Sequence, residues 1–307
     1  MADLLIVGAG TIGIAAAQAA LEDRVVLGVS GVVDPDPDAR ARGAAALETS
    51  GYASTLEVPL AREGDRALLV FSSLVEDVAP EILRLTSAGY HVVSTCEELA
   101  WPPRHIWEAL HTSARSTRRV IIMTGANPGF VMDRLALLTA AASRRLKSVT
   151  VRRRVDSATR RDTFLPKTGH GLDRAAFDAA VGAGTVGHRG IMASARLLAH
   201  TLGWPTNDVA QAIEPLLGDD GLATGFHQTV LLRADRRTID MELTIGWELQ
   251  GAGDTIIVEG EPPILLEIPG GYLGDQGAIA QILSALRRCA ELEPSFYRPT
   301  DLPLRFG

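Results

Sequence analysis

The segment that runs from Leu4 to Glu22 constrains the fold more than any other. A short apolar strand, Leu4 to Val7, leads directly into Gly8-Ala9-Gly10-Thr11-Ile12-Gly13, and an alanine-rich helical segment follows. This order is typical of the first unit of a Rossmann sheet, where the glycines allow a tight turn, close approach of a pyrophosphate and close helix packing. Asp34 lies 21 residues beyond Gly13, at the end of the next apolar run, where an acid binds ribose hydroxyls. We therefore predict a dinucleotide site formed by Gly8, Gly10, Thr11, Ile12, Gly13 and Asp34.

Apolar runs alternate with helix-compatible segments through the first part of the chain. The expected strands cover residues 25–33, 67–71, 90–93 and 120–123, and the expected helices cover 80–88 and 103–113. Such alternation predicts a doubly wound parallel sheet. After about Asp133 the pattern changes, and residues 238–249 alternate between apolar and polar side chains, which predicts a one-sided antiparallel strand. The expected fold class is α/β, with a Rossmann sheet and a second α+β domain.

Charge and composition exclude several classes of protein. The formal net charge of -7 disfavours a nucleic-acid binder, although the arginines between residues 152 and 161 are locally basic. The chain has no uninterrupted apolar run long enough for a membrane span, and its first residues lack a basic leader, so we expect a cytoplasmic protein. Cys96 and Cys289 are the only cysteines, which neither requires a disulfide nor supplies a zinc site.

Two adjacent carboxylates, Glu97 and Glu98, lie in the stretch Ser94 to Pro102, which follows the apolar run that ends in Val93. Thr95 and Glu98 have the spacing of a capping box, in which Glu98 reaches back to the backbone of Thr95 and has no catalytic role. Against this, Trp101-Pro102-Pro103 interrupts any helix that begins at Cys96, and ligands of such sheets bind beyond the carboxyl ends of the strands. The residues alone leave both interpretations open.

The segment Thr124-Gly125-Ala126-Asn127-Pro128-Gly129-Phe130 follows the next apolar strand. Asn-Pro-Gly is rich in turn residues, so a plain turn explains it. Its position after a parallel strand also places it at the same edge of the sheet as Glu97 and Glu98.

Six motifs together carry a resemblance to a known family: GAGTIG (8–13), VVSTCEEL (92–99), TGANPGFVMD (124–133), RRVDSATRR (153–161), GHRG (187–190) and GGYLGDQGAIAQI (270–282). With these motifs the chain resembles the 2,4-diaminopentanoate dehydrogenase-like branch of the dihydrodipicolinate reductase superfamily, which includes NAD(P)-dependent amine dehydrogenases. The resemblance extends over nearly the whole chain. It implies a Rossmann domain over residues 1–132, an α+β substrate-binding and dimerisation domain over 133–274, and a C-terminal helix and tail, 275–307, that return to the Rossmann domain.

The resemblance also implies roles for individual residues. The loop after the STC strand carries a catalytic glutamate in this family, which we place at Glu98 rather than Glu97. The nicotinamide end of the cofactor is expected at Ser72, Ser73, Thr95 and Asn127, and the substrate is expected at Trp101 and Phe130. One departure is His170, in Lys167-Thr168-Gly169-His170-Gly171, where a family K-I-G-A-G segment is expected. A histidine in a glycine-rich loop is more often solvated than catalytic, so we leave His170 out of the catalytic set.

The implied activity is the interconversion of a primary amine with a ketone or aldehyde plus ammonia, with NAD or NADP as cofactor. Arg40 and Arg42 follow Asp34 closely, which leaves the preference between the two cofactors open. Dihydrodipicolinate-type imine reduction and non-catalytic cofactor binding are the alternatives. A homodimer that binds only small molecules is expected. Arg153 is interpreted as an edge-strand charge or as a contact for an anionic substrate group.

Overall fold

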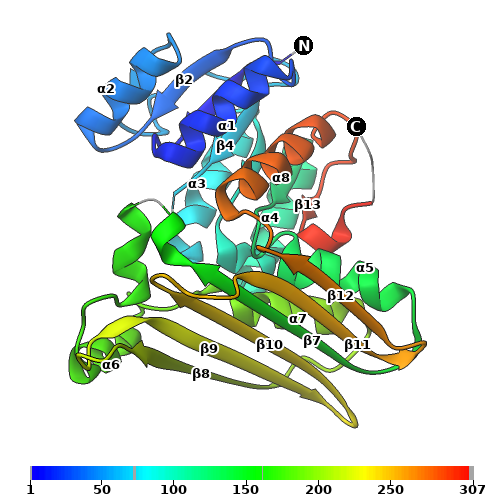
Figure 1. Cartoon of the computed structure of the whole chain (residues 1–307). Helices are drawn as coiled ribbons and strands as arrows, with labels where there is room; N and C mark the ends of the chain where they lie inside the picture. Colours follow the sequence, from blue (N-terminus) through cyan, green and yellow to red (C-terminus); the bar gives the residue numbers. More distant parts are fainter. Residues whose placement is uncertain (1, 72–73, 161, 304–307) are drawn as a thin grey trace. The chain divides into compact units, whose positions relative to one another are not determined.

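The structure is a computed structural model that describes residues 2–71, 74–160 and 162–303. The chain divides into two compact units. Unit 1 consists of Met1–Phe130 together with Gly274–Gly307, and unit 2 consists of Val131–Leu273. The Rossmann-type unit is therefore discontinuous in sequence, because its last helix and last strand come from the C-terminal end of the chain (Figure 1).

Unit 1 is built around a seven-stranded sheet. Its strands are β1 (Leu4–Val7), β2 (Val29–Val33), β3 (Gly51–Tyr52), β4 (Arg66–Leu69), β5 (His91–Ser94), β6 (Ile121–Met123) and β13 (Phe296–Tyr297). They lie in the order β13-β6-β5-β4-β1-β2-β3, and every neighbouring pair is parallel. This order confirms the doubly wound Rossmann sheet, in which the strand order reverses at β1.

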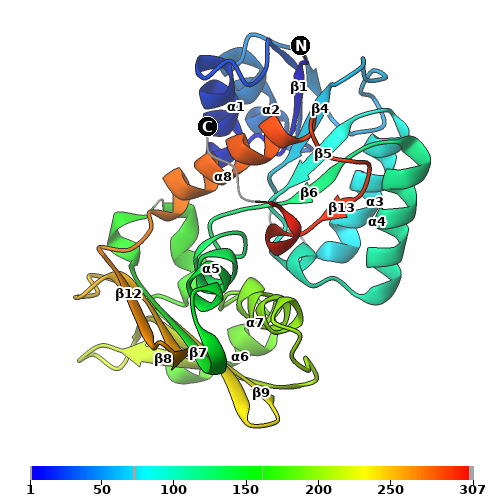
Figure 2. The same ribbon diagram turned by 90° about the vertical axis from the view of Figure 1, so that its right-hand side faces the viewer.

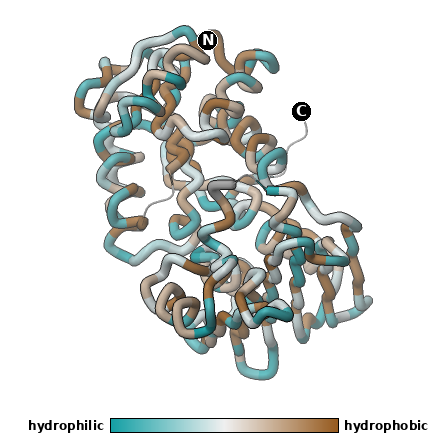
Figure 3. Tube along the Cα trace, turned by 60° about the vertical axis from the view of Figure 1, so that its left-hand side comes forward, coloured by the Kyte–Doolittle hydropathy of each residue, from teal (hydrophilic) through white to brown (hydrophobic). Residues whose placement is uncertain are grey.

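Helices cover both faces of this sheet. They are α1 (Thr11–Glu22), α2 (Pro37–Ala46), α3 (Val75–Ser87), α4 (Arg104–Thr117) and α8 (Gly274–Arg288), with short 3-10 helices η1 (Glu97–Ala100) and η5 (Pro299–Asp301). Helices α1 and α8 lie on one face, and α3 and α4 lie on the other (Figure 2). Hydrophobic and hydrophilic residues alternate along the helices, as expected for helices buried on one side only (Figure 3).

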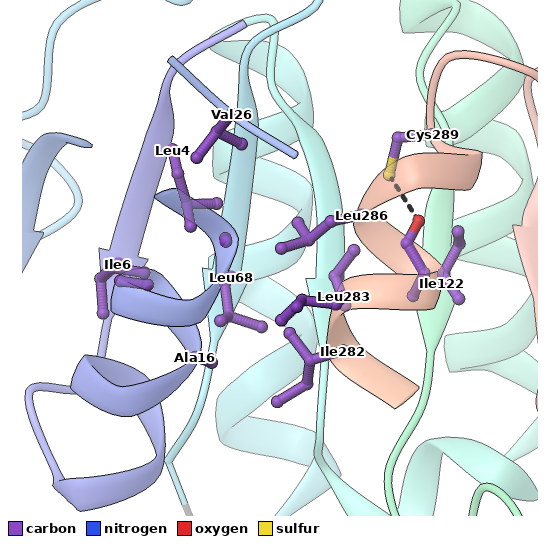
Figure 4. Close-up of a cluster of buried hydrophobic side chains, with 14 of the residues drawn as sticks. Leu4, Ile6, Ala16, Val26, Leu68, Ile122, Ile282, Leu283, Leu286 and Cys289 are labelled. Carbon is purple, nitrogen blue, oxygen red and sulfur yellow. Dashed lines mark hydrogen bonds between the residues drawn. The ribbon is translucent and has the colours of Figure 1, made fainter. Parts of the chain in front are cut away.

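The core on the α1 and α8 side joins the two ends of the chain. Leu4 and Ile6 of β1 are fully buried against side chains that include Ile282 and Leu286 of α8 (Figure 4). Alanines of α1 allow the helix to pack closely on the strands, because they carry no long side chain. Burying side chains of this kind contributes about 1.5–3 kcal/mol each, so this core is a main source of stability for unit 1.

Unit 2 carries its own sheet and helices. The strands are β7 (Arg144–Asp156), β8 (Asp208–Leu217), β9 (Ala223–Ala234), β10 (Arg237–Gly246), β11 (Gly253–Glu261) and β12 (Ile264–Pro269). The helices are η2 (Val131–Leu135), which is a π-helix, α5 (Ala136–Ala141), η3 (Ser157–Thr159), η4 (Asp162–Thr168), α6 (Arg174–Gly182) and α7 (Gly190–Thr201). This mixed sheet with helices confirms the expected α+β second domain.

The alternation predicted for residues 238–249 holds over β10, where Ile239, Met241, Leu243 and Ile245 are buried. Helices α5 and α7 pack against the strands on this apolar side. The prediction was only half right about direction, because β10 is antiparallel to β9 but parallel to β7. It was also too long, since the strand ends at Gly246 and the Trp247 side chain beyond it is 41% exposed.

Two predicted helices differ from the observed ones at their starts. Helix α3 begins at Val75, five residues before Pro80, which the sequence pattern had suggested as its first residue. Helix α4 begins at Arg104, and Pro103 is its N-cap. Within the described residues, none of the helices combines the length and the apolar character that crossing a membrane requires.

Candidate active site

The turn after β1 depends on two of its glycines for steric reasons. Gly8 has a φ of +103°, and a Cβ there would collide with the carbonyl oxygen of Val70. A Cβ at Gly13 would collide with the carbonyl oxygen of Gly8. At Gly10, by contrast, a Cβ would meet no atom within 4 Å, so the backbone there faces open space. The first and third glycines therefore build the turn, and the middle one leaves room for a ligand.

The start of α1 presents its backbone without a side-chain partner. Gly10 is the N-cap, no side chain of the described residues caps the helix, and the first turn contains no acidic residue. Thr11 is exposed and Ile12 is partly buried against the core. A helix start with uncapped N–H groups is a site that favours phosphate oxygens.

Asp34 lies directly after β2 and contacts the glycine turn. Its Oδ2 accepts a hydrogen bond from the Ala9 N–H at 2.8 Å, and its Oδ1 accepts one from the Asp36 N–H at 2.9 Å. Arg40 donates to the backbone carbonyl of Asp34 at 2.7 Å, so its guanidinium is already engaged. The carboxylate is thus held in one orientation beside the turn, and each oxygen keeps a lone pair for a ribose hydroxyl.

Glu98 lies in η1, just beyond the end of β5. Its Oε2 accepts a hydrogen bond from the backbone N–H of Val75 at 2.8 Å. Val75 is the first residue of α3, 23 positions earlier in the chain. Among the described residues, the other carboxylate oxygen, Oε1, has no hydrogen-bond partner. The side chain is therefore anchored at one oxygen and available at the other.

The capping box proposed for this segment does not form. The N-cap of η1 is Cys96, without a side-chain cap, and Glu98 bonds to Val75 rather than to the backbone of Thr95. The Thr95 hydroxyl instead donates to the carbonyl of Leu69 at 3.4 Å. Burial raises the pKa of the neighbouring Cys96 thiol to about 11, so this cysteine stays protonated near neutral pH and is no thiolate nucleophile.

The loop after β6 folds tightly on itself. A Cβ at Gly125 would crowd the carbonyl oxygen of Pro128, and a Cβ at Gly129 would collide with the backbone of Gly125. Both polar atoms of the Asn127 side chain in this loop are buried and have no hydrogen-bond partner among the residues that the structure describes. A buried carboxamide without partners costs about 1–3 kcal/mol, and such groups are rare in folded proteins. The arrangement therefore suits a ligand that supplies both a donor and an acceptor.

The topology gathers the predicted residues at one edge of the unit 1 sheet. The glycine turn, Asp34, Glu98 and Asn127 follow β1, β2, β5 and β6, and all these strands are parallel. Their carboxyl ends consequently meet at the same edge. Ser72 and Ser73, expected after β4, lie outside the described residues. Phe130, also at this edge of unit 1, is partly buried.

Trp101 follows η1 and contacts the C-terminal segment of the same unit. The Arg298 guanidinium lies 5.6 Å from the centre of its ring. Asp301 holds this arginine through two hydrogen bonds of 3.0 and 3.2 Å. One side of the Trp101 ring is therefore covered by Arg298, a contact that the sequence patterns did not suggest.

Two candidates in unit 2 are placed differently from each other. His170 is exposed, with its ring 5.3 Å from that of Trp247. Arg153 is only 7% exposed and lies in β7, an interior strand, so the edge-strand interpretation is wrong. Its guanidinium donates to both oxygens of Asp254 at 2.8 Å and to the carbonyl of Tyr272 at 2.7 Å. This internal carboxylate is the anion that Arg153 contacts.

A metal centre was not expected from the sequence. In the part of the chain that the structure describes, no group of three or more His, Cys, Asp and Glu side chains is placed to hold a metal ion.

Comparison with known proteins places the chain in a family. The model of the 2,4-diaminopentanoate dehydrogenase C-terminal domain matches residues 130–306, more than half of the chain. The chain belongs to this family. The resemblance seen in the sequence motifs is thereby confirmed, and the protein is a dehydrogenase with a Rossmann nucleotide-binding fold.

Individual members and solved structures extend the comparison. The 2,4-diaminopentanoate dehydrogenase of Acetoanaerobium sticklandii is 25% identical over 268 residues, which cover 79% of this chain and 75% of that protein. The amine dehydrogenase of Mycobacterium smegmatis has the same fold, with a TM-score of 0.82, 17% identity and coverage of 100% of this chain and 97% of that one. The WlbA dehydrogenase of Chromobacterium violaceum, solved with NADH and UDP-GlcNAcA, matches with a TM-score of 0.58, 17% identity and coverage of 87% and 74%.

Proposed function

We propose that this member of the family is an NAD(P)-dependent dehydrogenase that interconverts a primary amine and a ketone or aldehyde plus ammonia. The observation that carries the proposal is the Glu98 carboxylate at the carboxyl edge of the sheet, with one oxygen anchored and the other without a partner in the part of the chain that the structure describes. Two comparisons also support the proposal: the chain belongs to the 2,4-diaminopentanoate dehydrogenase family, and it shares its fold with an amine dehydrogenase.

The residues of unit 1 fit a nicotinamide dinucleotide. The open backbone at Gly10 and the uncapped start of α1 suit the pyrophosphate, with Gly8, Thr11, Ile12 and Gly13 completing the turn. Asp34 suits the adenosine ribose. At the nicotinamide end the proposed residues are Thr95, Asn127 and the two serines at 72 and 73, and the unpartnered carboxamide of Asn127 matches the donor and acceptor of a nicotinamide amide.

Glu98 is the proposed catalytic base. An amine substrate arrives largely protonated at neutral pH, and hydride cannot leave its α-carbon until the nitrogen has lost a proton. The free Oε1 of Glu98 takes that proton, and the bound cofactor supplies the hydride acceptor. Once Glu98 has passed that proton on to water, its carboxylate is negative again and favours the cationic iminium over the neutral amine, because opposite charges attract strongly where water is excluded.

Hydrolysis completes the proposed reaction. Water adds to the iminium carbon, the carbinolamine loses ammonia, and the carbonyl product forms, with Glu98 returning protons to the departing nitrogen. Reductive amination follows the same steps in reverse. The aromatic residues Trp101 and Phe130 are proposed to bound the substrate on its apolar side.

Two alternatives use the same fold. An imine reductase of the dihydrodipicolinate type needs residues for a dicarboxylate, but the sequence has no adjacent histidine pair and only two lysines, Lys147 and Lys167. A regulatory protein that binds the cofactor without turnover requires no base at Glu98. The direct test is consumption of NADH or NADPH with ammonia and a panel of ketones and aldehydes. Turnover that requires ammonia supports the proposal, and cofactor binding without any turnover contradicts it.

A homodimer formed through residues 133–274 is also proposed. The apolar face of the unit 2 sheet is covered by α5 and α7, so a partner is not needed there. The support comes from the family resemblance and from the opposite face, which carries Leu265, 61% exposed, as well as charged residues such as Arg152 and Glu242. Light scattering at micromolar concentration tests this proposal, and a monomer mass rules it out.

A further inference from the structure

The start of helix α3 has no cap of the ordinary kind. Its N-cap residue is Leu74, whose side chain cannot accept a hydrogen bond, and capping by a neighbouring side chain is absent among the described residues. The N–H groups of Asp77 and Val78 bond to the carbonyl of Leu74, as in any helix start. The Val75 N–H is different, because it donates across the sheet edge to Glu98.

This contact fixes the position of one carboxylate oxygen. Val75 is 2% exposed, so its N–H has little contact with water that could compete for the hydrogen bond. The donor belongs to the 13-residue helix α3, which is held in place by buried residues such as Ile82 and Leu85. The partial positive charge of a helix start also attracts an anion. The first N–H of α3 therefore holds Glu98 in place, and this donor is both rigid and positively polarised.

We infer that the backbone N–H of Val75 is the positioning group for the Glu98 base, which it orients so that Oε1 faces the substrate nitrogen. This inference rests on the proposed function of Glu98. Backbone donors are suited to the task because they have no rotamers to search, so the carboxylate is held in one geometry before substrate arrives. A purely structural cap would affect the stability of α3 but would leave the pH dependence of the reaction unchanged.

The geometry of the helix start permits a precise test, which is Val75→Pro. Proline lacks the N–H but is well tolerated at the first position of a helix, where its fixed φ is already helical. The preceding residue, Leu74, has φ -63° and ψ 152°, which is the conformation that a residue before proline prefers. Proline is also close to valine in size. The substitution therefore removes the hydrogen bond to Glu98 while retaining the helix.

The expected result has two parts. The turnover number falls about tenfold with NADH affinity nearly unchanged, because the base is misplaced but the cofactor site is intact. The acid limb of the pH–rate profile also moves to higher pH, since the carboxylate loses a donor that favours its charged form. A matched control is Arg174→Pro, at the first position of α6 in unit 2, where Asp173 also has an extended backbone conformation. This control should leave turnover and the pH profile as in the wild type.

A second measurement avoids any dependence on how the proline variant folds. In the wild-type holoenzyme labelled with ¹⁵N-valine, the amide resonance of Val75 should titrate with the same midpoint as the acid limb of activity. In Glu98→Gln this titration should disappear. The inference is overturned if the Val75 resonance does not change with pH. It is also overturned if Val75→Pro keeps normal turnover and a normal pH profile while Glu98→Gln is inactive. Either outcome leaves the proposed function intact. If Glu98→Gln keeps normal turnover, the proposed catalytic role of Glu98 is wrong, and the inference about Val75 falls with it.

Discussion

Helices α1 and α3 both begin at the carboxyl edge of the unit 1 sheet, but their first turns meet different partners. The start of α1 has no side-chain cap and no acid, and the backbone at Gly10 faces open space. The start of α3 donates to the carboxylate of Glu98, and acids at Glu76 and Asp77 lie in its first turn. Among the described residues, the start of α1 has no side-chain cap, which suits the proposed phosphate, whereas the start of α3 is used by the protein for its own side chain. The same backbone feature would thus serve the proposed binding in one case and the proposed positioning of Glu98 in the other.

Glu98→Gln tests the α3 side of this comparison and has the largest expected effect. Glutamine retains an acceptor for the Val75 N–H, so the melting temperature should change little. Loss of the base and of its charge should lower the turnover of amine oxidation roughly a hundredfold or more, with nearly unchanged NADH affinity. Glu97→Gln is the matched control. A collapse of turnover only in the Glu97 variant would transfer the catalytic role by one residue.

Gly10→Val tests the α1 side. The backbone of Gly10 has φ -76° and ψ 176°, which valine adopts without strain, and a Cβ there meets no protein atom within 4 Å. The protein should fold normally, while the added side chain should occupy the space needed by a pyrophosphate and weaken NADH binding by at least about tenfold. Titration of intrinsic fluorescence with NADH, together with circular dichroism, provides the measurement. Wild-type affinity in the folded variant would mean that α1 does not bind the pyrophosphate.

Asp34→Ala sharpens the comparison further, because it keeps the helix start and removes only the neighbouring acid. NADH binding should weaken about fivefold through loss of the contacts to the ribose hydroxyls, and NADPH binding should weaken less, because Asp34 repels a 2′-phosphate. Asp36→Ala is the control, since Asp36 is an exposed acid that caps α2. If NADPH binding falls more than NADH binding, Asp34 does not face the ribose.

A substitution of His91 is expected to have the smallest effect on the two helix starts. His91 is the first residue of β5, at the end of the strand away from Glu98. Burial, with Arg119 and Arg66 nearby, lowers the pKa of His91 to about 4, and its Nδ1 accepts from the Val120 N–H. Between about pH 6.5 and 4 the unfolded chain binds this proton and the folded chain does not. The free energy of unfolding should therefore fall as the pH decreases, by about 2 kcal/mol between pH 7 and 5.

His91→Asn should remove this part of the pH dependence, because asparagine does not titrate in this range. Urea unfolding at several pH values checks it, with turnover measured in parallel. An unchanged pH slope of stability in the variant would contradict the assignment to His91. Turnover should retain its wild-type acid limb, which separates protonation that affects the fold from protonation at Glu98.

Local patterns predicted the parts of the fold that depend on neighbours in sequence. Strand β1 was predicted with its observed bounds, and the glycines of the following turn were assigned the packing roles that the structure gives to Gly8 and Gly13. The order of apolar runs and helical segments sufficed for the parallel sheet, because a strand–helix–strand crossover between parallel strands of one sheet is right-handed by default.

Contacts between distant residues could not be predicted in this way. The capping box at Thr95 satisfied a local rule, but Glu98 finds its partner 23 residues away at Val75. Arg153 was expected at a sheet edge, whereas its carboxylate partner Asp254 lies 101 residues further along the chain. Nothing within ten residues of either side chain signals such partners, because sequence periodicity reports which face a residue occupies and not what lies opposite.

The discontinuity of unit 1 has a consequence for how the protein is made. The core around Leu4 and Ile6 is completed by Ile282 and Leu286, and β6 receives its neighbour β13 from residues Phe296–Tyr297. On the ribosome, the first 130 residues must therefore wait for the last 34 before the nucleotide-binding core can close, whereas Val131–Leu273 emerge as one uninterrupted stretch. During that interval the apolar side of the nascent sheet is exposed to chaperones and to aggregation. A stop codon near Gly274 would thus harm the folding of unit 1 more than that of residues 131–273.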